Sequence, residues 1–189
     1  MASHVNKPHV CPWWVGYFLI SPLRRFIQDP ESILAPYVKE GMTVLEIGPG
    51  MGYFSLPLAR LVGEKGKVLC VDIQKRMIER LMKRAAKAGI ADRITTVLAS
   101  EYSLHLDAYP GAADFALAFA VVHEVPDQSR LFEETYRVMK PASLLCLSEP
   151  KGHVEEEDFK KTIELAKANG FKVDSPINIK RSLSMILKK

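Results

Sequence analysis

Residues able to bind a polar or anionic ligand cluster between positions 44 and 54. Residues 44–47 are apolar except for one carboxylate, Glu46, and they predict a buried strand, because parallel strands are apolar on both faces. Three alternating glycines follow, and an apolar helical pattern begins at Phe54. Glycine lets a ligand approach the backbone closely, and a helix start offers free N–H groups to a carboxylate or phosphate. The stretch therefore predicts a ligand-binding strand–turn–helix unit.

The spacing of the glycines separates two kinds of nucleotide loop. A dinucleotide-binding loop has the pattern G-x-G-x-x-G, which would place its third glycine at position 53, where this chain has Tyr53. The loop instead reads E-x-G-x-G-x-G through Glu46, Gly48, Gly50 and Gly52. This pattern counts against an NAD-dependent oxidoreductase, and a tight turn without a ligand stays as the structural alternative.

The same loop resembles motif I of the class I S-adenosylmethionine-dependent methyltransferases. The resemblance covers about residues 30–189 and is greatest to small stand-alone methyltransferases of the type-11 group. It implies an enzyme that transfers a methyl group from S-adenosylmethionine to a small-molecule acceptor and leaves S-adenosylhomocysteine. It also implies that Glu46 lies near the methionine amino group of this cofactor. The loop residues expected to border the cofactor are Gly48, Pro49, Gly50 and Gly52.

Asp72 stands 20 positions after Gly52, directly after a predicted strand over residues 67–71. A carboxylate there can accept hydrogen bonds from both hydroxyls of a ribose, and it can also cap the helix that follows. In the family that the loop resembles, an apolar side chain after this carboxylate packs on the adenine, which implies that role for Ile73. The family's acidic residue beside the adenine has no direct match here, so either Ser100 or Glu101 takes its place.

A second group of polar residues follows the predicted strand over residues 114–119. Residues 119–127 resemble the His-containing segment after strand four of small-molecule methyltransferases, which implies that Phe119 borders the cofactor. His123 and Glu124 are our catalytic candidates, because doubly wound sheets bind ligands at the carboxyl ends of their strands. Alternatively, His123 orients a loop or packs beside the cofactor. The run HEVPD is not the zinc-binding HExxH, and no metal site is expected.

Candidate substrate contacts come from both ends of the fold. Glu149 and His153 follow the predicted strand over residues 143–147, where they either contact a substrate or form a solvated turn. The aromatic stretch 11–20 contains Trp14 and Tyr17 and precedes the fold. We predict that residues 1–29 form an N-terminal aromatic segment that acts as a lid, and that residues 30–189 form the methyltransferase domain. The alternatives for the stretch are packing on a sheet edge and contact with a membrane surface.

Apolar strand patterns alternate with helical patterns along the chain. This alternation predicts a parallel sheet with helices on both faces, and a terminal strand pair is expected within residues 171–187. The resemblance implies an α/β, Rossmann-like, doubly wound and mostly parallel seven-stranded sheet with an antiparallel last strand. The helices are expected over residues 29–39, from about residue 53, over 75–88, over 127–140 with Pro141 as the terminator, and over 155–169.

Composition limits the classes of function. The length of 189 residues suits one domain, and the hydrophobic content of 48% favours a folded protein. The net charge of +4 is spread along the chain, so no nucleic-acid partner is indicated. The three cysteines lie far apart, which favours reduced thiols and a cytoplasmic location. Two alternatives to a small-molecule methyltransferase stay open: a lipid or quinone methyltransferase at a membrane surface, and a non-catalytic S-adenosylmethionine-binding protein.

Overall fold

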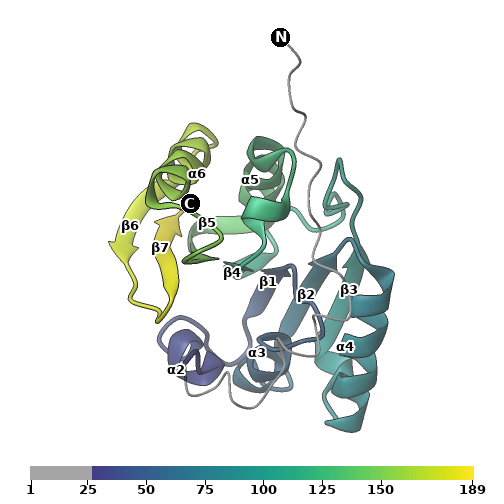
Figure 1. Ribbon diagram of the computed structural model, residues 1–189. Coiled ribbons are helices and arrows are strands. Elements are labelled where there is room, and N and C mark those ends of the chain that lie inside the picture. Colours follow the sequence, from purple (N-terminus) through teal and green to yellow (C-terminus); the bar gives the residue numbers. More distant parts are fainter. Residues whose placement is uncertain (1–26) are drawn as a thin grey trace.

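A single seven-stranded sheet forms the centre of the molecule (Figure 1). The computed structural model describes residues 27–189, so Trp14, Tyr17 and nearly all of the expected segment 1–29 lie outside the described residues. The sheet has the strand order β3-β2-β1-β4-β5-β7-β6. The strands are β1 (Thr43–Ile47), β2 (Lys67–Asp72), β3 (Ile94–Leu98), β4 (Ala113–Phe119), β5 (Met139–Pro150), β6 (Lys172–Pro176) and β7 (Ser182–Lys188).

The pairing of the strands confirms the predicted doubly wound sheet. Strands β1 to β5 pair in parallel, whereas β7 is antiparallel to both of its neighbours, β5 and β6. The chain builds β1, β2 and β3 outward in one direction and then returns to place β4 on the other side of β1. This reversal between β1 and β4 is a topological switch point, where open α/β sheets bind their ligands.

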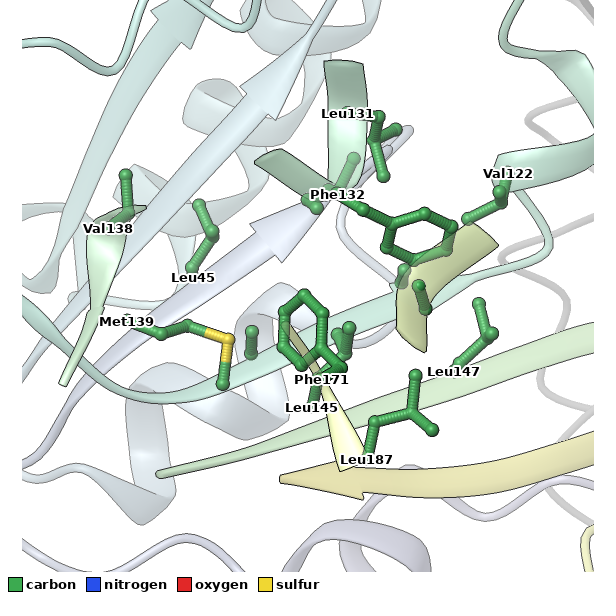
Figure 2. Close-up of a cluster of buried hydrophobic side chains, with 14 of the residues drawn as sticks. Leu45, Val122, Leu131, Phe132, Val138, Met139, Leu145, Leu147, Phe171 and Leu187 are labelled. Carbon is green, nitrogen blue, oxygen red and sulfur yellow. The ribbon is translucent and has the colours of Figure 1, made fainter. Parts of the chain in front are cut away.

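Helices cover both faces of the sheet (Figure 1). They are α2 (Pro30–Leu34), α3 (Ser55–Leu61), α4 (Lys75–Lys87), α5 (Gln128–Val138) and α6 (Glu156–Ala168), with two short 3-10 helices, η3 (Ala91–Arg93) and η4 (Val122–Glu124). One buried cluster joins α5 and α6 to the sheet and includes the fully buried Phe132 (Figure 2). A second cluster joins α2, α3 and α4 to the other face. Among the described residues, no helix combines the length and the apolar character needed to cross a membrane.

Two expected helix ends were wrong, and a proline is involved in each. The first helix was expected to reach residue 39 but ends at Leu34, because Pro36 has no N–H to donate to the preceding turn. The helix α5 ends at Val138, before Pro141, because strand β5 already begins at residue 139. Pro141 thus lies inside a strand, at a place where the pairing between β4 and β5 shifts register. Such irregular pairing tolerates a residue that cannot donate to the ladder.

Candidate active site

A cavity opens at the carboxyl ends of β1, β2, β3 and β4. Its walls come from the glycine loop, the end of β2, residues 99–104, residues 120–127 and the first turns of α5. It thus lies at the switch point between β1 and β4. Of the predicted site residues, those that line it are Gly48, Gly50, Asp72, Ile73, Ser100, Glu101 and Glu124.

The three glycines of the loop all have positive φ angles, but their surroundings differ. A Cβ at Gly48 would lie 2.6 Å from Val121, and a Cβ at Gly52 would lie 2.4 Å from Leu81. These two glycines therefore permit close packing, on the segment after β4 and on α4 respectively. A Cβ at Gly50 would meet no atom within 4 Å, and Gly50 lines the cavity. Its bare backbone is thus the place where a ligand can approach the loop.

Asp72 connects the glycine loop to the start of α4. One carboxylate oxygen accepts a hydrogen bond from Gly50 N at 3.1 Å, and the other accepts one from Gln74 N at 2.8 Å. Burial raises the pKa of Asp72, and its backbone hydrogen bonds oppose that rise. Because a carboxylate can accept about four hydrogen bonds, Asp72 keeps capacity for hydroxyl groups in the cavity. It can therefore support the start of a helix and bind a ribose at the same time.

The segment after β3 is held in place by a carboxylate that sequence reasoning missed. Glu134 of α5 is 4% exposed, and it accepts hydrogen bonds from Leu104 N at 2.6 Å and from Arg130 Nε at 3.0 Å. This contact fixes the end of residues 99–104, which contain both Ser100 and Glu101. Glu134 lies three residues after Leu131, on the buried face of α5. A charge within the apolar stripe of an amphipathic helix was the available signal.

Glu46 does not line the cavity, whereas Ile47, the next residue of β1, does. The side chain of Glu46 is 3% exposed and accepts a hydrogen bond from Cys70 Sγ at 3.5 Å. Burial raises its pKa to about 7, so the carboxyl group is protonated in weakly acidic solution. Phe119 also lies outside the cavity lining and packs on Phe54, with 4.4 Å between the ring centroids. The other predicted residues that do not line the cavity are Pro49, Gly52, His123, Glu149 and His153.

The ends of β4 and β5 bring the second group of predicted residues together. Ala120 has a left-handed φ of 55°, and its N–H donates to Ser148 O at 2.7 Å. This contact joins the two strand ends. Beyond it, Glu149 Oε2 accepts a hydrogen bond from His123 Nδ1, and the rings of His123 and His153 lie 6.1 Å apart. The resulting cluster stands beside the cavity, because Val121 and Glu124, which lie on either side of residues 122 and 123, both line it.

The fold and the glycine loop define a methyltransferase domain, and comparison with known proteins agrees. The sequence profile described as "Methyltransferase domain" matches residues 38–183, and the chain belongs to this family. The predicted resemblance to class I S-adenosylmethionine-dependent methyltransferases is thereby confirmed. A crystal structure of an S-adenosylmethionine-dependent methyltransferase from Aquifex aeolicus is similar, with a TM-score of 0.85 and 25% identity over 95% of this chain and 98% of that chain.

Two curated relatives share part of their length with this chain. A ubiquinone/menaquinone biosynthesis C-methyltransferase of Haemophilus ducreyi is 30% identical over 112 residues, which is 59% of this chain and 42% of the relative. An arsenite methyltransferase of Halobacterium salinarum is 30% identical over 125 residues, which is 64% of this chain and 30% of the relative. The match thus spans less than half of each curated relative.

Proposed function

We propose that this chain is an enzyme that transfers the methyl group of S-adenosylmethionine to a small-molecule acceptor. The observation that carries the proposal is the open space at Gly50, beside a carboxylate, Asp72, that accepts a hydrogen bond from Gly50 N. When bound, S-adenosylmethionine supplies a sulfonium methyl group that a nucleophile can displace in line. The contribution of the chain is then to align the acceptor with that methyl group.

Residues of the cavity suit the parts of this ligand. The backbone at Gly48 and Gly50 would hold its methionine end, and Asp72 would accept hydrogen bonds from the ribose hydroxyls. The adenine would be held by Ile73, Ser100 and Glu101, which all line the cavity. The remaining predicted residues act from outside the cavity: Glu46, Pro49, Gly52 and Phe119 support the loop and the strands beneath it.

The cheapest test of the ligand is a thermal-shift panel on the full chain. S-adenosylhomocysteine at about 100 times its Kd stabilises a folded protein by about 2.7 kcal/mol, so the melting temperature should rise measurably. NAD and NADP, at the same concentrations, should leave it unchanged. A shift with NAD alone would overturn the proposal.

A quinone or lipid acceptor is the second candidate within the same chemistry. The exposed fractions of Ile73 and Tyr102, which both line the cavity, are 38% and 77%. Apolar side chains at a cavity mouth suit an apolar acceptor delivered from a membrane surface, and the aromatic residues 13–18 would add to that contact. Flotation of the full chain with liposomes separates the two candidates: comigration supports a membrane-delivered acceptor, whereas the free small-molecule acceptor requires none.

We further propose that residues 1–29 form a lid over this site. The support for this lid comes from the hydrogen bonds of Gln28, which is close to the first described residue. Gln28 Nε2 donates hydrogen bonds to Lys180 O and to Ser182 Oγ, both at 3.1 Å, and Tyr53 Oη donates to Gln28 O at 2.8 Å. Tyr53 directly follows the glycine loop, so Gln28 is held beside the residue at which that loop ends. Trp14 and Tyr17 would then contact the acceptor.

Deleting residues 1–22 tests the lid. The shortened chain should remain folded and should still bind S-adenosylhomocysteine, because the described contacts of the core begin at Gln28. Its turnover should fall, since the lid would exclude water and position the acceptor. Circular dichroism checks the fold and calorimetric titration checks the affinity. An unfolded or insoluble product would show instead that the segment packs as part of the core.

A further inference from the structure

A buried carboxylate stands behind the imidazole of His123. The side chain of Glu149 is 2% exposed, and that of His123 is 24% exposed. One oxygen of Glu149 accepts a hydrogen bond from Val122 N at 2.8 Å, and the other accepts the hydrogen bond from His123 Nδ1. Both oxygens of Glu149 are thus committed to two consecutive residues of η4. The carboxylate fixes the position of the His123 ring together with the backbone that carries it.

This arrangement decides which ring nitrogen carries the proton. A carboxylate can only accept, so Nδ1 must donate to Glu149, and the neutral ring has its lone pair on Nε2. The other ionisable groups near the ring are Glu124, the next residue in the chain, and His153, whose ring centroid is 6.1 Å away. The hydrogen bond to Glu149 is the main cause that raises the pKa of His123, and partial burial opposes the rise.

The pair formed by His123 and Glu149, here called the dyad, lies next to the glycine loop and the cavity. Val121, two residues before His123, contacts the Cα side of Gly48 so closely that a Cβ there would be 2.6 Å away. Glu124, the residue after His123, lines the cavity. Val121 and Glu124, two residues before and one residue after His123, both line the cavity, so the partly exposed imidazole of His123 stands beside the place where an acceptor would enter.

We propose that Glu149 is a positioning residue that holds His123 in its Nδ1-protonated form, so that Nε2 accepts a proton from the methyl acceptor. The inference rests on the proposed function and narrows its substrate class. The acceptor carries an ionisable hydrogen on the atom that is methylated, as a hydroxyl, a thiol or a protonated amine does. An acceptor atom with a free lone pair and no hydrogen has no proton to lose and would not need this dyad as a base.

The methyl transfer needs only the acceptor, the methyl donor and the dyad. The acceptor atom forms a bond to the methyl carbon, and the electron pair of the broken carbon–sulfur bond stays on sulfur. His123 Nε2 accepts the proton that the acceptor atom releases. The resulting imidazolium is stabilised by Glu149, and His123 then releases the proton to water.

The first experiment measures the dyad without any acceptor. Long-range ¹⁵N–¹H spectra of the full chain with S-adenosylhomocysteine should show the Nδ1–H form of His123 and a pKa above the usual value of about 6.5. In Glu149→Gln that pKa should fall. The internal control is the ring spectrum of His105, which contacts Leu98 O and Ser100 Oγ and should look the same in both proteins. An Nε2–H form in the wild type, or an equal His123 pKa in both proteins, would overturn the proposal.

The second experiment follows S-adenosylhomocysteine formation with 1,4-naphthohydroquinone and thiophenol as probe acceptors. His123→Asn should lower kcat by about 100-fold or more, and Glu149→Gln by about 10- to 100-fold. Glu149→Gln should also move the rising limb of the pH profile to lower pH, because the imidazole loses a neighbouring negative charge. Glu149→Asp keeps the charge and should recover part of the rate, and Glu133→Gln, an exposed site on α5, should match the wild type.

The two experiments separate the dyad from the proposed function. If neither probe is methylated and S-adenosylhomocysteine does not bind, the proposed function fails. If a probe is methylated but His123→Asn and Glu149→Gln are as fast as the wild type, only the dyad fails. If neither probe is methylated although S-adenosylhomocysteine binds, the Nδ1–H form and the pKa shift in the spectra still decide the positioning role of Glu149.

Discussion

The site has two halves that are built in different ways: the cavity rim at the ends of β1, β2 and β3, and the cluster beside the cavity at the ends of β4 and β5. At the ends of β1, β2 and β3, the binding groups are backbone atoms of the glycine loop and one carboxylate, Asp72, that is bonded to Gly50 N. At the ends of β4 and β5, they are side chains: an imidazole, His123, paired with a buried carboxylate, Glu149. The first half suits the binding of a ligand common to a whole family, and the second suits proton transfer to or from a particular acceptor.

This difference predicts that substitutions in the two halves affect different properties of the protein. Changes at the glycine loop should act on the affinity for S-adenosylhomocysteine, whereas changes at the β4 and β5 ends should act on turnover. The buried carboxylates also differ, because Glu149 has an imidazole partner and Glu46 has a thiol. Substitutions at Gly50, Glu46 and His123 therefore test these contrasts separately.

The largest effect is expected from Gly50→Val. Its side chain would project into the space that the ligand needs, so binding of S-adenosylhomocysteine should be lost in calorimetric titration. Gly89→Val is a matched control, since both glycines have positive φ angles and a Cβ at either position would meet no atom within 4 Å. Both variants carry a similar backbone strain of about 1–2 kcal/mol. Equal affinities in the two variants would show that the glycine loop does not bind the ligand.

Glu46→Gln should stabilise the protein, by an amount that grows with pH. The folded-state pKa of Glu46 is raised from 4.5 to about 7 by burial, so the folded state binds more protons than the unfolded state between these values. Wild-type stability contributed by this group therefore falls as pH rises through that window. Above pH 7 the variant should gain on the order of 3 kcal/mol. Urea unfolding at pH 4.5 and pH 8 checks this, and a difference independent of pH would contradict it.

The smallest effect is expected for the affinity of His123→Ala. The imidazole does not line the cavity, so the Kd for S-adenosylhomocysteine should change by less than about 2-fold, which is below 0.5 kcal/mol. Calorimetric titration of the variant beside the wild type measures this. A large loss of affinity would show that His123 contacts S-adenosylhomocysteine, and the two halves would then not differ in function.

The half of the site near β1 to β3 could be predicted from the sequence because the residues that form it are identified by short sequence patterns. The glycines lie within five residues, and Asp72 ends the next strand, so spacing alone places them together. The topology of the sheet followed from the alternation of strands and helices and from the resemblance to a known family. The sequence does not determine whether the side chain of Glu46 faces the ligand, because alternation along a strand does not indicate which side chains reach a cavity at the strand ends.

The half near β4 and β5 could not be assembled in this way. His123 and Glu149 are 26 residues apart, and α5 lies between them. They meet only because the parallel register sets Phe119 beside Ser148, and sequence patterns do not specify that register. Glu134 was missed for a related reason: its partner, Leu104 N, belongs to a loop without regular structure.

The central claim is that the β1 to β3 half of the site binds S-adenosylmethionine. A titration of ¹⁵N-labelled full-length protein with S-adenosylhomocysteine tests it most directly, through the backbone amide signals. We expect saturable shifts for the amides of Gly48, Gly50, Ile73 and Ser100, with the amides of β6 unchanged. Absence of these shifts, or shifts confined to residues outside the cavity, would contradict it.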